Sequence, residues 1–438
     1  MEEEETPLYN LTIPLGCNEN DELFSKLKQL LEAGVYDWSG LNFTDCLPQC
    51  GVCNPASRWE VYMIYNLIVI GIILPLVGTL GLMGNAISAY VYSRKEMRCS
   101  TNSYLFGLAC SDSAVISTGI FVFSLETYRH FSLLLDRIAG YLSGTVFALG
   151  TIAQTCSVYF TIAAGADCFA QVCLNEKIRR FVSRPHFVRF TSCFVVAFSL
   201  FYNVPHFFEG FTIDCYHQYF GGPSIEVCPT TLRYNNLYVE IYYNYMYTIF
   251  LAVGPLIMLI ILNSFIIGFS VFGSASTSSE DNMSLILVVL LFICCNIAAL
   301  FINIFETLLS DIMGANINFI VDFSNLLVVF NSSFNFIIYK KYSRSFADTL
   351  AKYVTGRSSE KKKRKGMRTT EDCSLKEPLA NGNKAMIIEN QQRSKICRDA
   401  VGRLLAASQP EVSSTAPLAT FDILSLTSAN TSPLQSRV

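Results

Sequence analysis

The sequence predicts an all-α membrane protein, a seven-transmembrane helix bundle with its N-terminus outside the cell and its C-terminus inside. Hydrophobic residues make up 51% of the 438 residues and charged residues only 15%, whereas soluble chains carry about 25% charge. The charges lie almost entirely in the first 60 residues, in short loops and after Lys340. This distribution excludes a soluble enzyme, a coiled coil and a mostly disordered protein.

Seven apolar blocks are long enough to cross a bilayer, which takes about 20 apolar residues in a helix. No Arg or Lys lies in the central part of any block, and several blocks contain the Gly or Pro that membrane helices tolerate. A β-barrel would show alternating segments of about 10 residues instead. We therefore predict spans over residues 61–92, 104–128, 138–164, 187–208, 237–272, 285–309 and 317–339.

Basic residues in the short loops set the orientation. The loops after the first and third blocks and the segment 340–368 are rich in Arg and Lys, whereas residues 1–60 are mainly acidic. The short loop 273–282 carries no basic residue and departs from this pattern. The basic segments fall on one side, which predicts an outer N-terminus and a multi-pass protein of the plasma membrane.

The chain divides into four predicted parts. They are an extracellular N-terminal segment (1–60), a transmembrane domain (61–340), a membrane-parallel amphipathic helix (341–356) and a disordered, Ser/Thr-rich cytoplasmic tail (357–438). Asn10 and Asn42 begin outer Asn-x-Ser/Thr sequons and are predicted glycosylation sites.

An even number of cysteines on the outer side predicts disulfides. They are Cys17, Cys46, Cys50, Cys53, Cys215 and Cys228. The sequence does not settle their pairing. Cys215 and Cys228 flank residues 221–223 in one loop, so the simplest expectation is a local bridge between these two. Zinc binding by the cluster of three is the less favoured alternative, because no His lies near it.

Polar motifs recur inside the blocks, where polar side chains usually face the bundle interior. They are Gly84-Asn85, Leu108-Ala109-Cys110-Ser111-Asp112 and the run from Asn331 to Tyr339. Seven spans with these motifs resemble a rhodopsin-type G-protein-coupled receptor over about residues 65–350. The runs 150–155, 202–205, 261–263 and 331–336 resemble invertebrate FMRFamide-type neuropeptide receptors.

The resemblance implies a sodium pocket in the bundle interior and no required cofactor. A carboxylate with neutral oxygens suits a hard cation; a polar network that only packs the helices is the alternative. The matching residues are Asp112, Ser157, Asn331, Ser332 and Asn335.

The resemblance also implies a heterotrimeric G protein and arrestin as partners at the inner end. The matching residues there are Asp167, Cys168, Phe169, Asn335 and Tyr339. Cys168 stands where the family has the Arg that engages the G protein, so altered or lost coupling is an open alternative.

A basic amidated peptide, the ligand that the resemblance implies, needs acids near the outer mouth of the bundle. Glu209, Asp214 and Glu226 lie in the second outer loop. For any single acid, the simpler interpretation is a charge in a solvated loop. For any single Tyr, it is a residue of the aromatic belt at the membrane interface. The predicted ligand-binding residues are Glu126, Gln154, Glu240, Tyr245, Phe301, Glu306 and Asp322.

The predicted function is a receptor for an FMRFamide-like neuropeptide. The alternative is a chemosensory or orphan seven-helix receptor for a small molecule, with weakened or non-standard coupling. No phosphate loop, metal-ligand cluster or catalytic triad is visible, so an enzyme is not expected. A nucleic-acid partner is not expected either. The basic run 361–365 predicts contact with anionic membrane lipid, and the end at Val438 predicts a PDZ partner.

Overall fold

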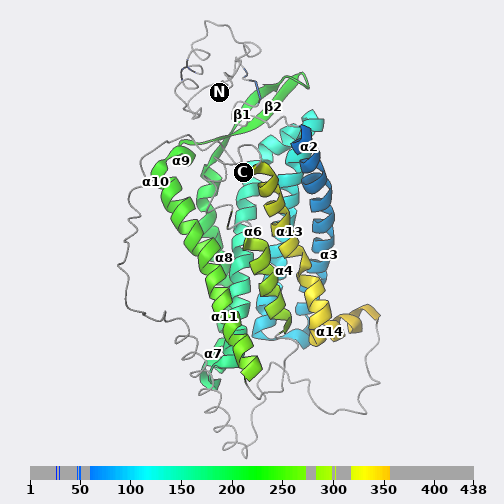
Figure 1. Cartoon of the computed structure of the whole chain (residues 1–438), viewed down its shortest axis with the longest axis vertical. Helices are drawn as coiled ribbons and strands as arrows, with labels where there is room; N and C mark the ends of the chain where they lie inside the picture. The colour runs from blue at the N-terminus through cyan, green and yellow to red at the C-terminus, as the bar shows by residue number, and fades with distance from the viewer. Residues whose placement is uncertain are drawn as a thin grey trace, which may run out of the picture.

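The computed structural model is an elongated helical bundle with a β hairpin at one end and a short helix, α14, at the other (Figure 1). It describes residues 60–272, 283–297, 301 and 317–355, together with Lys26, Gln29, Leu47, Gln49 and Cys50. Outside the described residues lie the predicted sites at Asn10, Asn42, Glu306, 361–365 and Val438, the cysteines Cys17, Cys46 and Cys53, the loop 273–282 and the tail 357–438.

Within the described part of the chain, six helical stretches are long and apolar enough to cross a membrane. They are Val61–Tyr92, Ser100–Phe131, Leu133–Cys173, Pro185–Phe208, Asn236–Gly268 and Ile317–Tyr342. A shorter apolar helix, Met283–Ile297, lies in the sixth predicted block, most of whose remainder is outside the described residues. The seven-span prediction thus matches the described helices, and the third span extends well beyond its predicted ends.

The spans are built from the following elements. The first contains α2 (Glu60–Asn66) and α3 (Leu74–Tyr92), joined by a π-helical segment Leu67–Ile73; the second contains α4 (Ser100–Gly119) and α5 (Leu125–Tyr128). The third is α6 (Leu133–Cys173), which α7 (Glu176–Val182) follows, and the fourth begins with α8 (Pro185–Asn203). The fifth runs from α10 (Asn236–Tyr238) through π-helical segments Val239–Met246 and Thr248–Ala252 into α11 (Val253–Phe272); α13 (Ile317–Tyr342) is the last, and α14 (Arg344–Thr355) follows it.

Helix α6 is central: it packs against α4, α8 and α11, while α3 packs against α4 and α13. Small residues permit the close approaches, as is usual between membrane helices. A Cβ on Gly81 would lie 2.2 Å from the hydroxyl oxygen of Ser333, and one on Gly107 would lie 2.6 Å from the ring of Phe160. These contacts fix the helices that carry the interior polar residues.

The second outer loop folds into a hairpin of β1 (Gly210–His217) and β2 (Gly222–Pro229). The strands are antiparallel, with Cys215 opposite Ser224 and His217 opposite Gly222. Gly221 occupies the turn with φ of 64°, a conformation that glycine adopts without strain.

The predicted bridge between Cys215 and Cys228 is wrong. Cys215 is bonded to Cys50, with a Cα–Cα distance of 5.0 Å, and Cys228 is disulfide-bonded elsewhere. The register explains the error. Cys228 lies opposite Phe211, four residues from Cys215 along β1, which is about 13 Å at the rise of a strand. A disulfide needs Cα atoms within about 7 Å.

The Cys50 bridge fastens part of the N-terminal segment to the hairpin. The Cys50 amide also donates to the Tyr216 carbonyl at 3.0 Å, and Gln49 forms a parallel bridge with Tyr216. Gln49 and Cys50 are therefore held against β1 by both covalent and backbone contacts.

Candidate functional site

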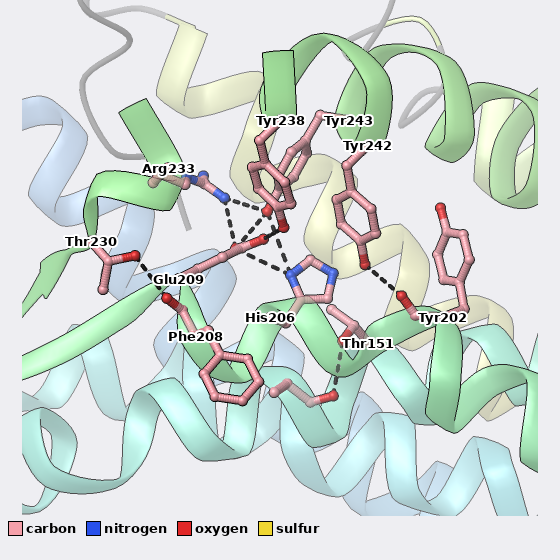
Figure 2. Close-up of polar contacts among 11 residues, drawn as sticks. Thr151, Tyr202, His206, Phe208, Glu209, Thr230, Arg233, Tyr238, Tyr242 and Tyr243 are labelled. Carbon is pink, nitrogen blue, oxygen red and sulfur yellow. Dashed lines mark hydrogen bonds and ion pairs between the residues drawn. The ribbon is translucent and has the colours of Figure 1, made fainter. Parts of the chain in front are cut away.

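A buried carboxylate, Glu209, lies where the fourth span, the hairpin and the fifth span meet (Figure 2). Its Oε1 accepts a hydrogen bond from the Tyr238 hydroxyl at 2.6 Å, and its Oε2 accepts one from the Tyr243 hydroxyl at 2.6 Å. Arg233 Nη1 is 3.1 Å from Oε2, and His206 Nδ1 is 3.2 Å from it. We call these five residues the Glu209 cluster.

The partners keep Glu209 ionised despite its burial. Burial alone raises its pKa, but the hydrogen bond and charge of His206 and the hydrogen bonds from Tyr238 and Tyr243 outweigh it and lower the pKa to about 2. Glu209 is therefore a buried, ionised carboxylate at the outer end of the bundle, with its oxygens enclosed by donors.

Aromatic rings extend from the Glu209 cluster along the fourth and fifth spans. The Tyr242 ring stacks between Tyr238, at 5.2 Å between centroids, and Tyr202, at 5.6 Å. The Tyr242 hydroxyl donates to the Tyr202 carbonyl at 2.8 Å (Figure 2). Phe147 on α6 meets the His206 ring edge-to-face at 5.6 Å. The third, fourth and fifth spans thus share one aromatic surface beside the carboxylate.

A second buried carboxylate, Asp136, holds the hairpin on α6. Arg129 Nε donates to its Oδ1 at 2.7 Å, and the Ser224 hydroxyl donates to its Oδ2. Gly140, one turn along α6, allows the backbone of β2 to approach, because a Cβ there would lie 1.9 Å from the Ile225 carbonyl oxygen. We call Asp136, Arg129, Ser224 and Gly140 the Asp136 clamp.

The bundle interior contains a polar network centred on Asp112, whose side chain is fully buried. The Ser157 hydroxyl donates to Asp112 Oδ1 at 2.7 Å, and Asn335 Nδ2 donates to Oδ2 at 2.8 Å. The Ser332 hydroxyl is a further partner of the carboxylate, and Asn85 Nδ2 donates to the Ser332 carbonyl at 2.8 Å.

These contacts join the first, second, third and seventh spans through the residues named for the sodium pocket. Asn331, the fifth of those residues, is also buried on α13. The described residues contain no group of three or more His, Cys, Asp and Glu side chains arranged to hold a metal.

Residues 84–339 match the family model of the 7 transmembrane receptor (rhodopsin family). The chain belongs to this family. It is therefore a multi-pass receptor of the plasma membrane, from a family of receptors that signal through heterotrimeric G proteins.

Three curated relatives refine the assignment. The receptor is 43% identical over 327 residues to the probable G-protein coupled receptor frpr-1 of Caenorhabditis elegans, covering 70% of this chain and 85% of that one. It is 33% identical over 294 residues to the FMRFamide receptor of Drosophila melanogaster, covering 64% of this chain and 52% of that one. It is 25% identical over 292 residues to the FMRFamide peptide receptor frpr-18 of Caenorhabditis elegans, covering 62% and 65%.

At the inner end of the receptor, four of the residues named for transduction are buried and Phe169 is half-buried. Asp167 accepts hydrogen bonds from the hydroxyls of Ser100 and Thr101 at 2.7 and 2.5 Å, which tie it to α4. Cys168 is 4% exposed and belongs to the apolar core. It therefore brings no cation to the position where the family has its Arg.

Two aromatic residues complete this end. The Phe169 ring lies 5.8 Å from that of Phe265 on α11. The Tyr339 ring contacts Tyr92 at 5.4 Å and Phe346 of α14 at 5.7 Å. Packing of α14 is thus coupled to the inner end of α13.

Among the residues that the structure describes, the predicted ligand-binding side chains do not form one group. Exposed Glu126 pairs with Arg129 at 3.1 Å, beside the Asp136 clamp. Asp322 is buried and accepts a hydrogen bond from Asn66 at 2.8 Å, so it joins the seventh span to the first. Gln154 is half-buried on α6. The remaining described members, Glu240, Tyr245 and Phe301, are exposed.

Sequence reasoning gave no specific role to Glu209 and overlooked Asp136. Glu209 appeared only as one of three acids in the second outer loop. The pattern that distinguishes it is the pair Tyr238 and Tyr243 at the start of the next span, since phenol hydroxyls satisfy a buried carboxylate. Asp136 lies in a stretch assigned to a loop, before the predicted third span.

Proposed function

We propose that this receptor binds a short, basic, C-terminally amidated neuropeptide of the FMRFamide type at its outer end and signals to a heterotrimeric G protein. The observation that carries the proposal is its similarity to receptors named for this peptide, at 33% identity over 294 residues in the Drosophila protein. The absence of catalytic activity belongs to the same proposal, since the family is one of receptors.

The outer end suits such a ligand chemically. FMRFamide ends in an arginine followed by an amidated phenylalanine, so it presents a guanidinium and an aromatic ring but no terminal carboxylate. An ionised carboxylate recognises a guanidinium strongly, and offset or edge-to-face rings contribute about 0.5–1.5 kcal/mol beyond their buried area. Glu209 and the stack of Tyr202, Tyr242 and Tyr238 place both features side by side.

Signalling follows from a shift between conformations rather than from chemistry. A peptide that binds one arrangement of the helices better shifts the population toward it. The Asp112 network is the interior element that links four spans, and a sodium ion bound there would favour one arrangement.

The proposal includes three further partners. They are arrestin at the inner end, membrane lipid at residues 361–365 and a PDZ protein at Val438. Pull-down with a peptide ending at Val438 tests the PDZ partner.

Cys168 supports a second candidate, a receptor of the same family with altered coupling. The buried thiol cannot make the charged contact that the family's Arg makes with a transducer. A peptide receptor with this change would bind its ligand and signal weakly, or signal through a non-standard route.

A signalling screen separates these candidates. Cells that express the receptor, with surface level measured by an outer epitope tag, are exposed to amidated peptides and to their free-acid forms while calcium and cAMP are recorded. We expect responses to peptides that end in Arg-Phe-amide and not to the free acids. Responses only to small non-peptide molecules would overturn the proposal in favour of a chemosensory receptor.

A further inference from the structure

Arg233 makes the contacts that a protein uses to bind a guanidinium from another molecule. Its Nη1 lies 3.1 Å from Glu209 Oε2 and also donates to the Tyr243 hydroxyl. Its Cζ lies 4.8 Å from the centroid of the Tyr243 ring. An ion pair, a phenol hydrogen bond and a cation–π contact thus converge on one side chain.

Arg233 is the more accessible of the two basic partners of Glu209. Its side chain is 26% exposed, against 9% for His206. Tyr238 and Tyr243 belong to the long fifth span, whereas Arg233 lies in α9 (Thr231–Tyr234), a helix of four residues between β2 and that span (Figure 1). So short a helix has little stability of its own. Arg233 is therefore the partner that can leave with the least disturbance to the bundle.

We propose that Arg233 is a tethered guanidinium that the arginine of the ligand replaces on Glu209. The inference rests on the proposed function, because it requires a ligand with an arginine. In the exchange, one guanidinium leaves the carboxylate as another arrives, so Glu209 keeps a cationic partner throughout. Tyr238, Tyr243 and His206 stay in place and position the carboxylate for either partner.

The exchange makes Arg233 a competitor of the ligand. Removal of Arg233 should therefore raise the affinity of the receptor for the ligand. If the tether occupies the site most of the time, the apparent affinity of the ligand equals its intrinsic affinity multiplied by the fraction of receptors whose site is open. For a partly exposed ion pair, removal of the competitor lowers the apparent Kd by about two- to sixfold. If Arg233 only supports the structure, its removal should lower the affinity for the ligand, because Glu209 then lacks its guanidinium partner and the site is weakened.

The experiment compares two peptides on membranes that contain the full-length receptor. One ends in Arg-Phe-amide, and in the other citrulline replaces the arginine, which keeps the shape and removes the charge. We expect Arg233→Ala to tighten binding of the arginine peptide about two- to sixfold and to leave binding of the citrulline peptide unchanged. The matched control is Arg137→Ala, which removes an exposed arginine from the outer end of α6 and should change neither affinity.

Two further variants distinguish the exchange on Glu209 from a general effect of Arg233→Ala on peptide binding. Glu209→Gln should weaken the arginine peptide about tenfold or more with little effect on the citrulline peptide. Arg233→Ala in that background should give no gain. If Arg233→Ala fails to reach the surface, Arg233→Lys can be tested in its place. Lysine keeps the charge but not the planar guanidinium, so it should tighten binding of the arginine peptide by a smaller factor.

Each failure has a distinct meaning. Weakened or unchanged binding of the arginine peptide to surface-expressed Arg233→Ala, or equal tightening of both peptides, overturns the exchange while the proposed function stands. If only Arg233→Lys reaches the surface, unchanged or weakened binding overturns the exchange in the same way. Absence of binding of any Arg-Phe-amide peptide to the wild-type receptor overturns the proposed function and the exchange together.

Discussion

Asp136→Asn is the substitution that tests most directly how the outer hairpin is held. The carboxylate is 2% exposed and accepts hydrogen bonds from Arg129 and Ser224. An amide of the same shape loses the charge and one acceptor, so the guanidinium loses its charged partner. A hydrogen bond to a charged group contributes about 1.5–3 kcal/mol, and the nearby Glu126 retains part of the pairing of Arg129. We expect a loss of about 2–3 kcal/mol in the stability of the outer end.

The assay is thermal unfolding of the purified receptor together with hydrogen exchange of the hairpin amides. A loss of this size lowers the Tm by about 4–10 °C for a domain of this length. It speeds exchange across β1 and β2 by roughly 30-fold or more if the hairpin opens locally. The matched control is Asp214→Asn, a change on an exposed residue of the same hairpin, which should alter stability by less than about 0.5 kcal/mol. If Asp136→Asn melts with the wild type and its hairpin exchanges no faster, the clamp does not hold the hairpin.

Three other predictions concern separate parts of the receptor. A non-reducing peptide map should join Cys50 to Cys215, and Cys215→Ser should lower the Tm and weaken peptide binding; a map that joins Cys215 to Cys228 would show the pairing to be incorrect. Cys168→Arg should raise basal cAMP or calcium signalling, since it adds a cation at the inner end where Asp167 is already bonded to α4; unchanged signalling at equal surface level would show that Cys168 does not limit coupling. Replacing choline chloride with sodium chloride should weaken agonist binding to the wild type and not to Asp112→Asn; equal sensitivity in both would exclude a sodium site at Asp112.

The transmembrane spans were predictable because the bilayer imposes one length and one composition on every crossing helix. The apolar blocks therefore locate the spans, but their ends depend on polar residues that the structure buries. Asp136 and Asp167 extend α6 at its two ends because partners from the hairpin and from α4 satisfy them. A hydropathy pattern alone contains no information about such partners.

The outer end was not predictable in the same way, because its contacts join segments far apart in the sequence. Cys50 and Cys215 are separated by 165 residues, and a cysteine count does not contain the hairpin register that keeps Cys228 away from Cys215. Asp322 has the sequence position of a pocket acid, yet Asn66 on the first span pairs with it. Glu209 was visible only as a loop acid until its tyrosine partners were placed around it.

Saturation binding of a labelled Arg-Phe-amide peptide to membranes from receptor-expressing cells tests the proposed function most directly, because it needs no G protein and so does not depend on Cys168. We expect saturable binding that the unlabelled amidated peptide displaces and that its free-acid form displaces far less well. Surface-expressed receptor without saturable binding of any such peptide would contradict the assignment.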